Sequence, residues 1–221
     1  MEKILRFASV GTSTVMDTMQ EAMRQTPRVA CELVYSRSEA RAREYADKVG
    51  VKRICGDFQA MLAMPEIDAL YIASPNSLHA AQTIAALEHG KHVVVEKPAA
   101  CTVREIHAMR DAARANGVFF FEAITTIFMP NLLDAAALLP RLGRIRAAEI
   151  RYGQYSSRYD EFLRGGLPSV FNPLMQGGAL NDLGIYCIHT ALALFGVPES
   201  MRSETEYLDN GVDIADTLYL S

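Results

Sequence analysis

The chain of 221 residues has a mass of 24.4 kDa, which leaves room for one large domain or two small ones. Half of the residues (50%) are hydrophobic and 22% are charged, and this balance excludes a disordered or collagen-like chain. The formal net charge of −4 provides no bulk attraction to nucleic acid or to an anionic membrane surface, so we expect neither as a partner.

Residues 1–123 alternate between short apolar runs and helical patterns. Strands are expected at 4–10, 29–35, 69–73, 92–95 and 118–121, and helices at 15–25, 39–49, 78–88 and 103–115. Short apolar strands separated by amphipathic helices predict a doubly wound parallel sheet with right-handed crossovers. We therefore expect residues 1–123 to form a doubly wound α/β domain of the Rossmann type.

Residues 124–221 have a different pattern and contain no lysine. Helices are expected at 131–139 and 180–195, an alternating strand at 144–153, an irregular stretch at 154–173, and two strands at 200–208 and 214–221 joined by an Asn210-Gly211 turn. This pattern predicts an α+β domain with a partial open mixed or antiparallel sheet. Because the sequence ends within the last strand, we expect an uncovered strand edge and a homo-oligomer formed through this sheet.

The cysteines, the N-terminus and the apolar runs bear on where the protein is located. None of the four cysteines forms a Cys-x-x-Cys pair, so buried free thiols are expected. The N-terminus lacks the pattern of a secretory signal, and the uninterrupted apolar runs are shorter than the ~20 residues that span a bilayer. We expect a cytoplasmic protein without membrane association.

The first strand-to-helix turn is a candidate nucleotide site, formed by Gly11, Thr12, Ser13, Thr14 and Val15. A dinucleotide fingerprint has the form G-x-G-x-x-G/A, in which glycines let the backbone approach a pyrophosphate at a helix N-terminus. Only the first glycine is present here. The turn therefore has two interpretations, a phosphate-binding turn or an ordinary strand-to-helix connection, and in either case Ser13 and Thr14 can cap the helix and offer hydroxyls to a phosphate.

The end of the second strand points to the choice of cofactor. An NAD site usually has an acidic residue at this position, which binds the ribose 2′-hydroxyl. This chain has Ser36 and Arg37 instead, and a guanidinium suits a 2′-phosphate. Ser36 and Glu39 can also form a capping box for the next helix, and both interpretations can hold. The residues favour NADP over NAD.

Three motifs carry a resemblance to a known family. Ser74-Pro75-Asn76 is followed by His79, Glu96-Lys97-Pro98 follows the next strand, and a later pattern has the following members: Gly177, Gly178, Asp182, Gly184 and Tyr186. With these motifs in this order, the chain resembles the Gfo/Idh/MocA group of oxidoreductases, named after glucose–fructose oxidoreductase and inositol dehydrogenase. The resemblance implies an NAD(P)-binding Rossmann domain, residues 1–123, followed by a substrate domain with a large open sheet, of which residues 124–221 form a partial substrate-binding and oligomerisation domain. Members usually run beyond 300 residues, so we expect a C-terminally truncated member.

The resemblance also implies roles for individual residues. The segment Ser74, Pro75 and Asn76, together with His79, is expected to bind the cofactor. Glu96 is expected to bind the nicotinamide ribose rather than act as a base. Lys97, held at a strand end by a Lys-Pro bond that is often cis in the family, is expected to exchange the hydroxyl proton of an alcohol or to stabilise an alkoxide.

Asp182, Tyr186 and His189 share one face of the expected 180–195 helix. By the resemblance, Asp182 binds a substrate hydroxyl and Tyr186 takes the position of the family's acid/base histidine. His189 has two interpretations, a second proton carrier or a packing residue. No third ligand stands at a sensible spacing, so no metal site is expected.

The polar and aromatic segment 154–160 lies in a long loop, and long loops are often functional. Tyr155 and Arg158 are therefore candidates for substrate binding or for an interface. Together these residues predict an NADP(H)-dependent oxidoreductase acting on a sugar, cyclitol or diol. The alternative is a non-catalytic nucleotide-binding regulator or an inactive truncated family member.

Overall fold

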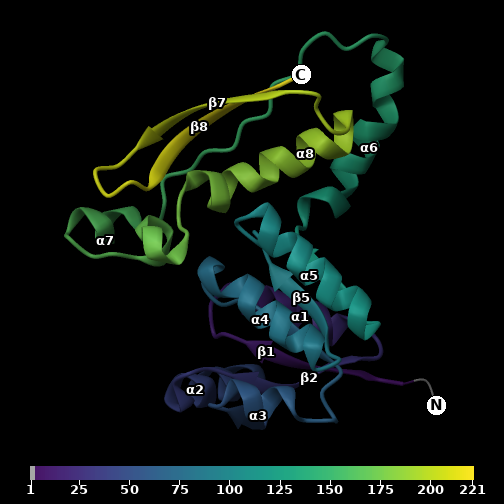
Figure 1. Ribbon diagram of the computed structural model, residues 1–221, viewed down its shortest axis with the longest axis vertical. Helices are drawn as coiled ribbons and strands as arrows, with labels where there is room; N and C mark the ends of the chain where they lie inside the picture. Colours follow the sequence, from purple (N-terminus) through teal and green to yellow (C-terminus); the bar gives the residue numbers. More distant parts are fainter. Residues whose placement is uncertain (1–2) are drawn as a thin grey trace. The chain divides into compact units, whose positions relative to one another are not determined.

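The computed structural model describes residues 3–221, and the chain divides into two compact units, 1–123 and 124–221. The first unit contains one parallel sheet of six strands within the described residues, in the order β3-β2-β1-β4-β5-β6 (Figure 1). Its strands are β1 Leu5–Val10, β2 Val29–Tyr35, β3 Arg53–Cys55, β4 Ala69–Ile72, β5 His92–Glu96 and β6 Phe120–Ala123. Its helices are α1 Val15–Gln25, α2 Glu39–Val49, α3 Phe58–Leu62, α4 Asn76–Glu88 and α5 Val103–Asn116. This arrangement confirms the predicted α/β fold of the first unit.

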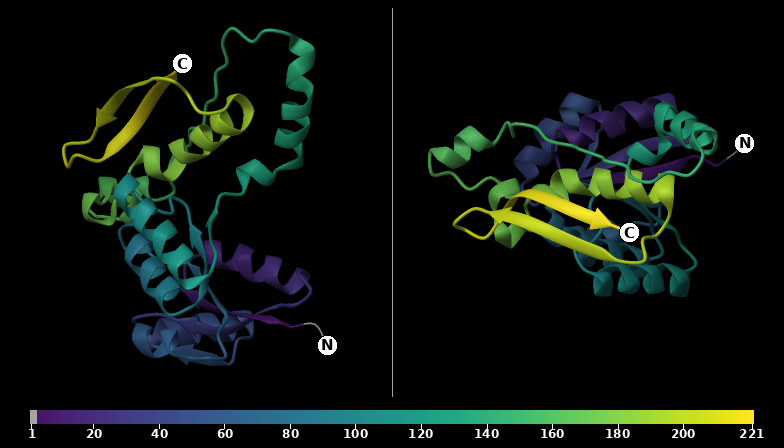
Figure 2. Two further views of the ribbon diagram at one scale, coloured as in Figure 1. Left: turned by 45° about the vertical axis from the view of Figure 1, so that its right-hand side comes forward. Right: turned by 90° about the horizontal axis from the view of Figure 1, so that it is seen from above.

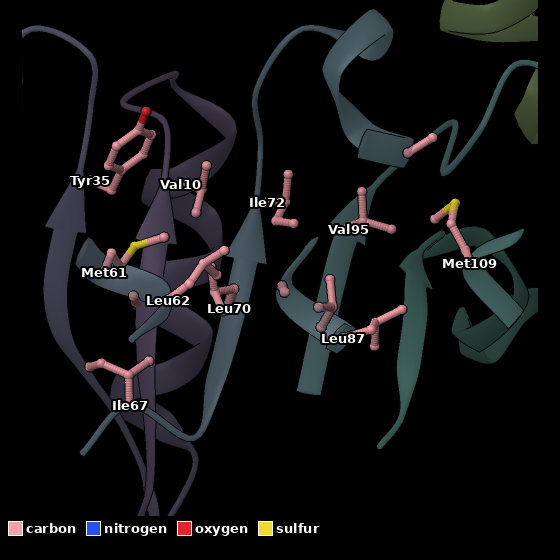
Figure 3. Close-up of a cluster of buried hydrophobic side chains, with 14 of the residues drawn as sticks. Val10, Tyr35, Met61, Leu62, Ile67, Leu70, Ile72, Leu87, Val95 and Met109 are labelled. Atoms are coloured by element: carbon pink, nitrogen blue, oxygen red, sulfur yellow. The ribbon is translucent and has the colours of Figure 1, made fainter. Parts of the chain in front are cut away.

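Both faces of the sheet are covered, as its apolar strands require. On one face, Leu70, Ile72 and Val95 pack in a cluster with Leu62, Leu87 and Met109 from the helices (Figure 3). On the other face, the alternate residues Ala69 and Tyr71 pack with Met16 and Met23 of α1. Side chains of one strand alternate between the two faces, so a continuous apolar run such as 69–72 serves both clusters.

Helix boundaries in the first unit follow from polar caps. Asp57 accepts hydrogen bonds from the backbone amides of Gln59 (2.8 Å) and Ala60 (3.0 Å) at the start of α3. At the start of α5 the Thr102 hydroxyl accepts from the Glu105 amide (3.2 Å), and the Glu105 carboxylate accepts from the amide of Cys101 (3.2 Å), the residue before the N-cap. The sequence pattern does not predict β3 and α3, because three and five residues are too short to show a periodicity.

The second unit combines short helices with one antiparallel hairpin. Its helices are α6 Pro130–Leu138, α7 Tyr159–Leu163 and α8 Ile185–Phe195, and its strands are β7 Met201–Tyr207 and β8 Asp213–Leu220. The hairpin turns at the predicted Asn210-Gly211 pair, where Gly211 has φ +82°. α8 runs alongside the hairpin (Figures 1 and 2). The fold class of an α/β Rossmann domain followed by an α+β region is confirmed.

The predicted strand at 144–153 is wrong. This segment forms no strand in the structure, and within residues 3–221 β7 and β8 pair only with each other. Figure 2 shows the segment as part of the long irregular connection between α6 and α7. Alternation alone does not make a strand, because the backbone amides and carbonyls of a strand need a neighbouring strand as partner.

The predicted helix at 180–195 is present but is not uniform. Its first turn, Leu180–Gly184, is a π-helix, and the α-helix α8 starts at Ile185. By length and composition, the stretch 173–195 has the apolar character of a bilayer-spanning helix, with a mean hydropathy of 1.2. In the structure this stretch is divided into a 3-10 turn at Pro173–Met175, a glycine turn and the helical run 180–195. That run is shorter than the ~20 residues that a span requires.

Candidate functional site

Most of the sequence-predicted residues of the first unit gather at the carboxyl edge of its parallel sheet. Gly11 follows β1, Ser36 and Arg37 follow β2, Ser74 follows β4, and Lys97 follows β5. β1 and β4 are neighbours in the sheet although β2 and β3 lie between them in sequence, so the strand order reverses at this point. Open α/β sheets bind ligands in the crevice at such a reversal.

Gly11 allows two strand ends to approach each other closely. Its φ of +114° is a conformation that other residues rarely adopt, and a β-carbon there would lie 2.7 Å from the carbonyl oxygen of Ala73. Its amide donates to the carbonyl oxygen of Tyr35 (3.1 Å). The backbone of the first turn is therefore held in the open form that a phosphate-binding turn needs, although only one of the fingerprint glycines is present.

The hydroxyls of the first turn do not cap α1. Thr14 is the N-cap residue, but its side chain makes no capping hydrogen bond within the described structure, so the prediction of side-chain capping at this helix is wrong. The amides of Met16 and Asp17 bond instead to the carbonyls of Ser13 (3.0 Å) and Thr14 (3.0 Å). Ser13 and Thr14 are exposed at the helix N-terminus, where hydroxyl and amide groups can meet an anion.

The prediction that Ser36 caps the helix α2 is also wrong, because the cap lies two residues further along the chain. α2 is capped by Ser38, whose hydroxyl accepts from the Arg41 amide (3.4 Å). The Ser36 hydroxyl accepts from the amide of Ser38 (3.2 Å), which holds the loop, and Arg37 is exposed. Burial raises the pKa of the Tyr35 phenol, and the nearby positive charge of Arg37 opposes this rise. Arg37 therefore follows the end of β2 with an exposed side chain, and its role toward a 2′-phosphate stays a prediction.

His79 joins the two loops that carry the family motifs. Its side chain is 1% exposed, with Nδ1 2.8 Å from the carbonyl oxygen of Pro98 and Nε2 2.8 Å from that of Ser74. Carbonyl oxygens only accept, so both contacts are hydrogen bonds at once when both ring nitrogens carry a hydrogen. Both contacts are to backbone atoms of the chain itself, and the ring fixes the loop after β4 to the loop after β5.

Two residues that sequence reasoning missed hold the Glu96-Lys97-Pro98 segment. The buried Tyr71 donates from its hydroxyl to Glu96 Oε1, and Glu122, in β6, accepts from the amide of Ala99 (2.7 Å). The Lys97-Pro98 peptide bond is cis, as the resemblance implied, and Lys97 is half-buried. The hydroxyl of a tyrosine inside the apolar run 69–73 was the available signal, because a buried hydroxyl requires a polar partner.

In the second unit, Asp182 lies in the π turn and Tyr186 and His189 lie in α8, so the predicted helical neighbours do share one helical segment. The ring of Tyr186 lies against that of Tyr152, with 5.7 Å between the ring centroids. Both rings line a cavity of about 470 Å³, together with Thr126 and Arg151. The guanidinium of Arg151 is exposed and pairs with Glu149 (2.6 Å), so the polar groups that the residues around the cavity can offer a hydroxylated molecule include the phenols of Tyr152 and Tyr186.

Tyr155 and Arg158 belong to a folded part of the long loop. The Tyr155 hydroxyl donates to Asp160 (2.6 Å), and this hydrogen bond raises the pKa of the phenol. The Tyr155 ring packs on Tyr159, which in turn packs on Phe162 and Phe171. The loop is therefore anchored by an aromatic cluster around α7, and the substrate-side role of Tyr155 and Arg158 stays a prediction.

Residues 3–221 contain no group of three or more metal-binding side chains, and all four cysteines are free thiols. Burial raises the pKa of the thiols of Cys31, Cys101 and Cys187, which keeps them in the protonated form. These thiols are therefore poor nucleophiles and poor metal ligands at neutral pH.

Comparison with known proteins shows the class of this chain. Residues 5–124 match the oxidoreductase family with an NAD-binding Rossmann fold, and residues 140–221 match the GFO/IDH/MocA C-terminal domain. The chain belongs to the Gfo/Idh/MocA oxidoreductase family, which confirms the resemblance seen in its motifs.

Individual relatives extend this comparison. The chain is 41% identical over 218 residues to scyllo-inositol 2-dehydrogenase (NADP(+)) IolU of Bacillus subtilis strain 168, covering 99% of this chain and 66% of that protein. It is 40% identical over 210 residues to the uncharacterized oxidoreductase YgjR of Escherichia coli K12, covering 95% and 64%. The solved structure of KijD10, a 3-ketoreductase from Actinomadura kijaniata in complex with NADP and TDP-benzene, shares the fold with a TM-score of 0.84 at 24% identity, covering 97% and 65%. The chain thus spans about two thirds of the length of the curated relatives that it matches.

Proposed function

We propose that this chain is, or forms most of, an NADP(H)-dependent oxidoreductase that moves hydride between nicotinamide and a secondary alcohol or carbonyl carbon of a sugar, cyclitol or diol. The observation that carries the proposal is the convergence of Gly11, Ser36-Arg37 and Lys97 at one edge of the parallel sheet. The name of the Bacillus subtilis relative, an NADP(+) scyllo-inositol dehydrogenase, supports both the cofactor and the substrate class.

The residues of this edge fit a dinucleotide. The lack of a β-carbon at Gly11 lets the first turn lie directly against the chain that follows β4, and the exposed N-terminus of α1 offers amides and hydroxyls to the pyrophosphate. Ser36 and Arg37 offer a hydroxyl and a guanidinium to the 2′-phosphate. Ser74, Pro75 and Asn76 line the other side of the strand reversal, and Glu96 is proposed to bind the nicotinamide ribose.

When bound, the nicotinamide supplies or accepts the hydride, and the chain must manage the proton. Lys97 is proposed to exchange the hydroxyl proton of the substrate through Nζ, and its positive form stabilises a developing alkoxide. In the second unit, Asp182 is proposed to bind a substrate hydroxyl and Tyr186 to act as a second proton carrier. The cavity lined by Tyr152, Tyr186 and Thr126 supports a hydroxylated substrate.

The test separates an enzyme from the alternative of a non-catalytic nucleotide-binding regulator or an inactive family member. NADP and NAD are titrated by calorimetry, and hydride transfer is then screened over inositols, pentoses and diols by the absorbance of the reduced nicotinamide. Lys97→Met should keep NADP affinity and lower kcat by roughly 10²–10⁴-fold, because it removes the proton carrier. The exposed Lys52 provides the matched control, Lys52→Met, which should leave kcat unchanged.

Two outcomes contradict the proposal. Binding of NADP without turnover of any of these compounds would favour the regulator. Turnover that survives Lys97→Met would show that Lys97 has been given the wrong role.

We also propose that the second unit associates with a second copy of the chain. The irregular segment 144–153 and β8 border a cavity of about 750 Å³ with mostly apolar walls, which include Ile145, Ile188 and Leu218. Exposed strand edges and apolar surfaces favour association. Light scattering at micromolar concentration should give a mass above that of one chain. A stable monomer would contradict the proposal.

The cytoplasm is the proposed compartment. The four free cysteines support it, since a reducing environment keeps thiols from pairing.

A further inference from the structure

The start of the helical segment that carries Asp182 and Tyr186 is shaped by two glycines. A β-carbon on Gly177 would lie 2.5 Å from the carbonyl oxygen of Ser169 and 2.4 Å from that of Val170. Gly178 is buried and has φ +127°, and a β-carbon there would lie 1.9 Å from Oδ1 of Asp213. The space beside Gly178 is thus occupied by a carboxylate that belongs to β8.

Asp213 reaches this space from the first residue of β8. Its Oδ2 accepts a hydrogen bond of 2.6 Å from the amide of Leu180, the first residue of the π turn. The amide of Asp182, two residues further on, bonds to the carbonyl oxygen of Gly178 (3.0 Å). One carboxylate therefore contacts both the glycine turn and the first amide of the helical segment. A negative charge at that end is favoured by the orientation of the backbone dipoles.

We propose that Asp213 is a positioning residue, whose carboxylate fixes the start of the segment 180–186 and thereby the places of Asp182 and Tyr186. This inference rests on the proposed function, because it assigns Asp213 to the support of residues proposed to handle substrate. The inference also explains why glycine stands at position 178, since any side chain there would displace the Asp213 carboxylate.

A second aspartate lies beside Asp213 on β8. Asp216 accepts a hydrogen bond from the Thr205 hydroxyl (2.8 Å). Burial raises the pKa of Asp216, the hydrogen bond from Thr205 opposes this rise, and the neighbouring Asp213 adds to it. The two carboxylates therefore have separate donors, the Leu180 amide for Asp213 and the Thr205 hydroxyl for Asp216.

The experiment compares Asp213→Ala and Asp213→Asn in the full chain with a matched control, Asp209→Ala. Asp209 is an exposed aspartate in the turn of the same hairpin. The first readout is hydrogen exchange of the Leu180 amide. Asp213→Ala should accelerate it by about tenfold or more relative to the control, because the acceptor is lost. Asp213→Asn keeps a carbonyl acceptor and should fall between the two.

The second readout is catalytic. Asp213→Ala should lower kcat by up to about 10²-fold, the size of effect that a misplaced reacting group produces, while calorimetric NADP affinity stays within about twofold. A merely structural role would lower the melting temperature without this separation between kcat and NADP binding. Asp213→Asn should recover part of the lost kcat.

Gly178→Ala supplies an independent test that leaves Asp213 in place. Its β-carbon should push the carboxylate away and accelerate exchange at Leu180. The double variant Gly178→Ala/Asp213→Ala should exchange no faster than the faster single variant, because both act through one contact.

Wild-type exchange at Leu180 in Asp213→Ala would overturn the inference, and so would additive effects in the double variant. Failure of the proposed function has a different signature, since a wild-type chain without turnover leaves the exchange measurement intact. Turnover that is unchanged in Asp213→Ala, with exchange accelerated, would overturn the positioning role and leave the proposed function standing.

Discussion

Gly11→Ala tests whether the close approach of β1 and β4 shapes the nucleotide edge. The new β-carbon would lie 2.7 Å from the carbonyl oxygen of Ala73, inside the 3.0 Å limit that β-carbons essentially never cross. It would also force alanine into φ +114°. We assign about 1–2 kcal/mol to the backbone conformation and about 1–3 kcal/mol to the overlap, so the free energy of unfolding should fall by about 2–5 kcal/mol.

Gly117→Ala is the matched control, because Gly117 also has a positive φ (+63°) but a β-carbon there would have no neighbouring atom within 4 Å. It should cost only about 1 kcal/mol, since alanine also restricts the unfolded chain. Urea denaturation measures both values, and calorimetry measures NADP affinity. Gly11→Ala should weaken NADP binding, whereas Gly117→Ala should not, because Gly117 precedes β6 at the amino edge of the sheet. Equal destabilisation by the two variants would refute the argument from close approach.

Two further predictions concern charge. Arg37→Asp should reverse the preference for NADP over NAD, because the loss of a charge-assisted contact weakens NADP binding by about 1–3 kcal/mol. Arg110→Asp on α5 makes the same charge change and should leave the preference unaltered. Equal affinities for both cofactors in the unmodified chain would contradict this prediction. Burial of Asp68 favours its neutral form, but hydrogen bonds from Lys3 and Arg6 outweigh this and lower its pKa from 3.8 to about 2. The stabilisation from this lowered pKa is fully present above pH 4 and is lost as the pH falls through about 2. Asp68→Asn should therefore lower the free energy of unfolding by about 2 kcal/mol at neutral pH and weaken its dependence on pH between 4 and 2. Denaturation at several pH values measures both effects.

The parallel sheet could be predicted because its signals are local. Each of β1, β2, β4 and β5 is a mostly apolar run followed by a turn, and the helices between them end at residues such as Gly50. In the segment 144–153, apolar and polar residues alternate as they do in a half-buried strand, yet this segment forms no strand. Its state depends on a partner strand, and a partner is a property of the fold rather than of the segment.

The site residues divide in the same way. The residues that we propose to bind cofactor or substrate could be named from the sequence, since Lys97 and Arg37 stand at strand ends and carry motif chemistry. The residues that hold them could not, because Tyr71 is 25 positions from Glu96 and Asp213 is 33 positions from Leu180. A pairing over such a separation leaves no spacing pattern in the sequence, and only the topology brings its members together.

Gly11 and Gly178 both belong to sequence motifs, but the sequence does not show why glycine is required at either position. Gly11 and Gly178 both have a positive φ, and at both positions the space of a β-carbon is taken by an atom from a distant strand or the loop that follows it. At Gly11 that atom is a backbone carbonyl, which no substitution of a side chain removes. At Gly178 it belongs to the Asp213 side chain, so shortening that side chain removes the overlap and leaves only the backbone strain. In a chain that carries Asp213→Ala, alanine should therefore lower the free energy of unfolding more at position 11 than at position 178. Glycine at a positive φ thus has two different physical causes in this chain.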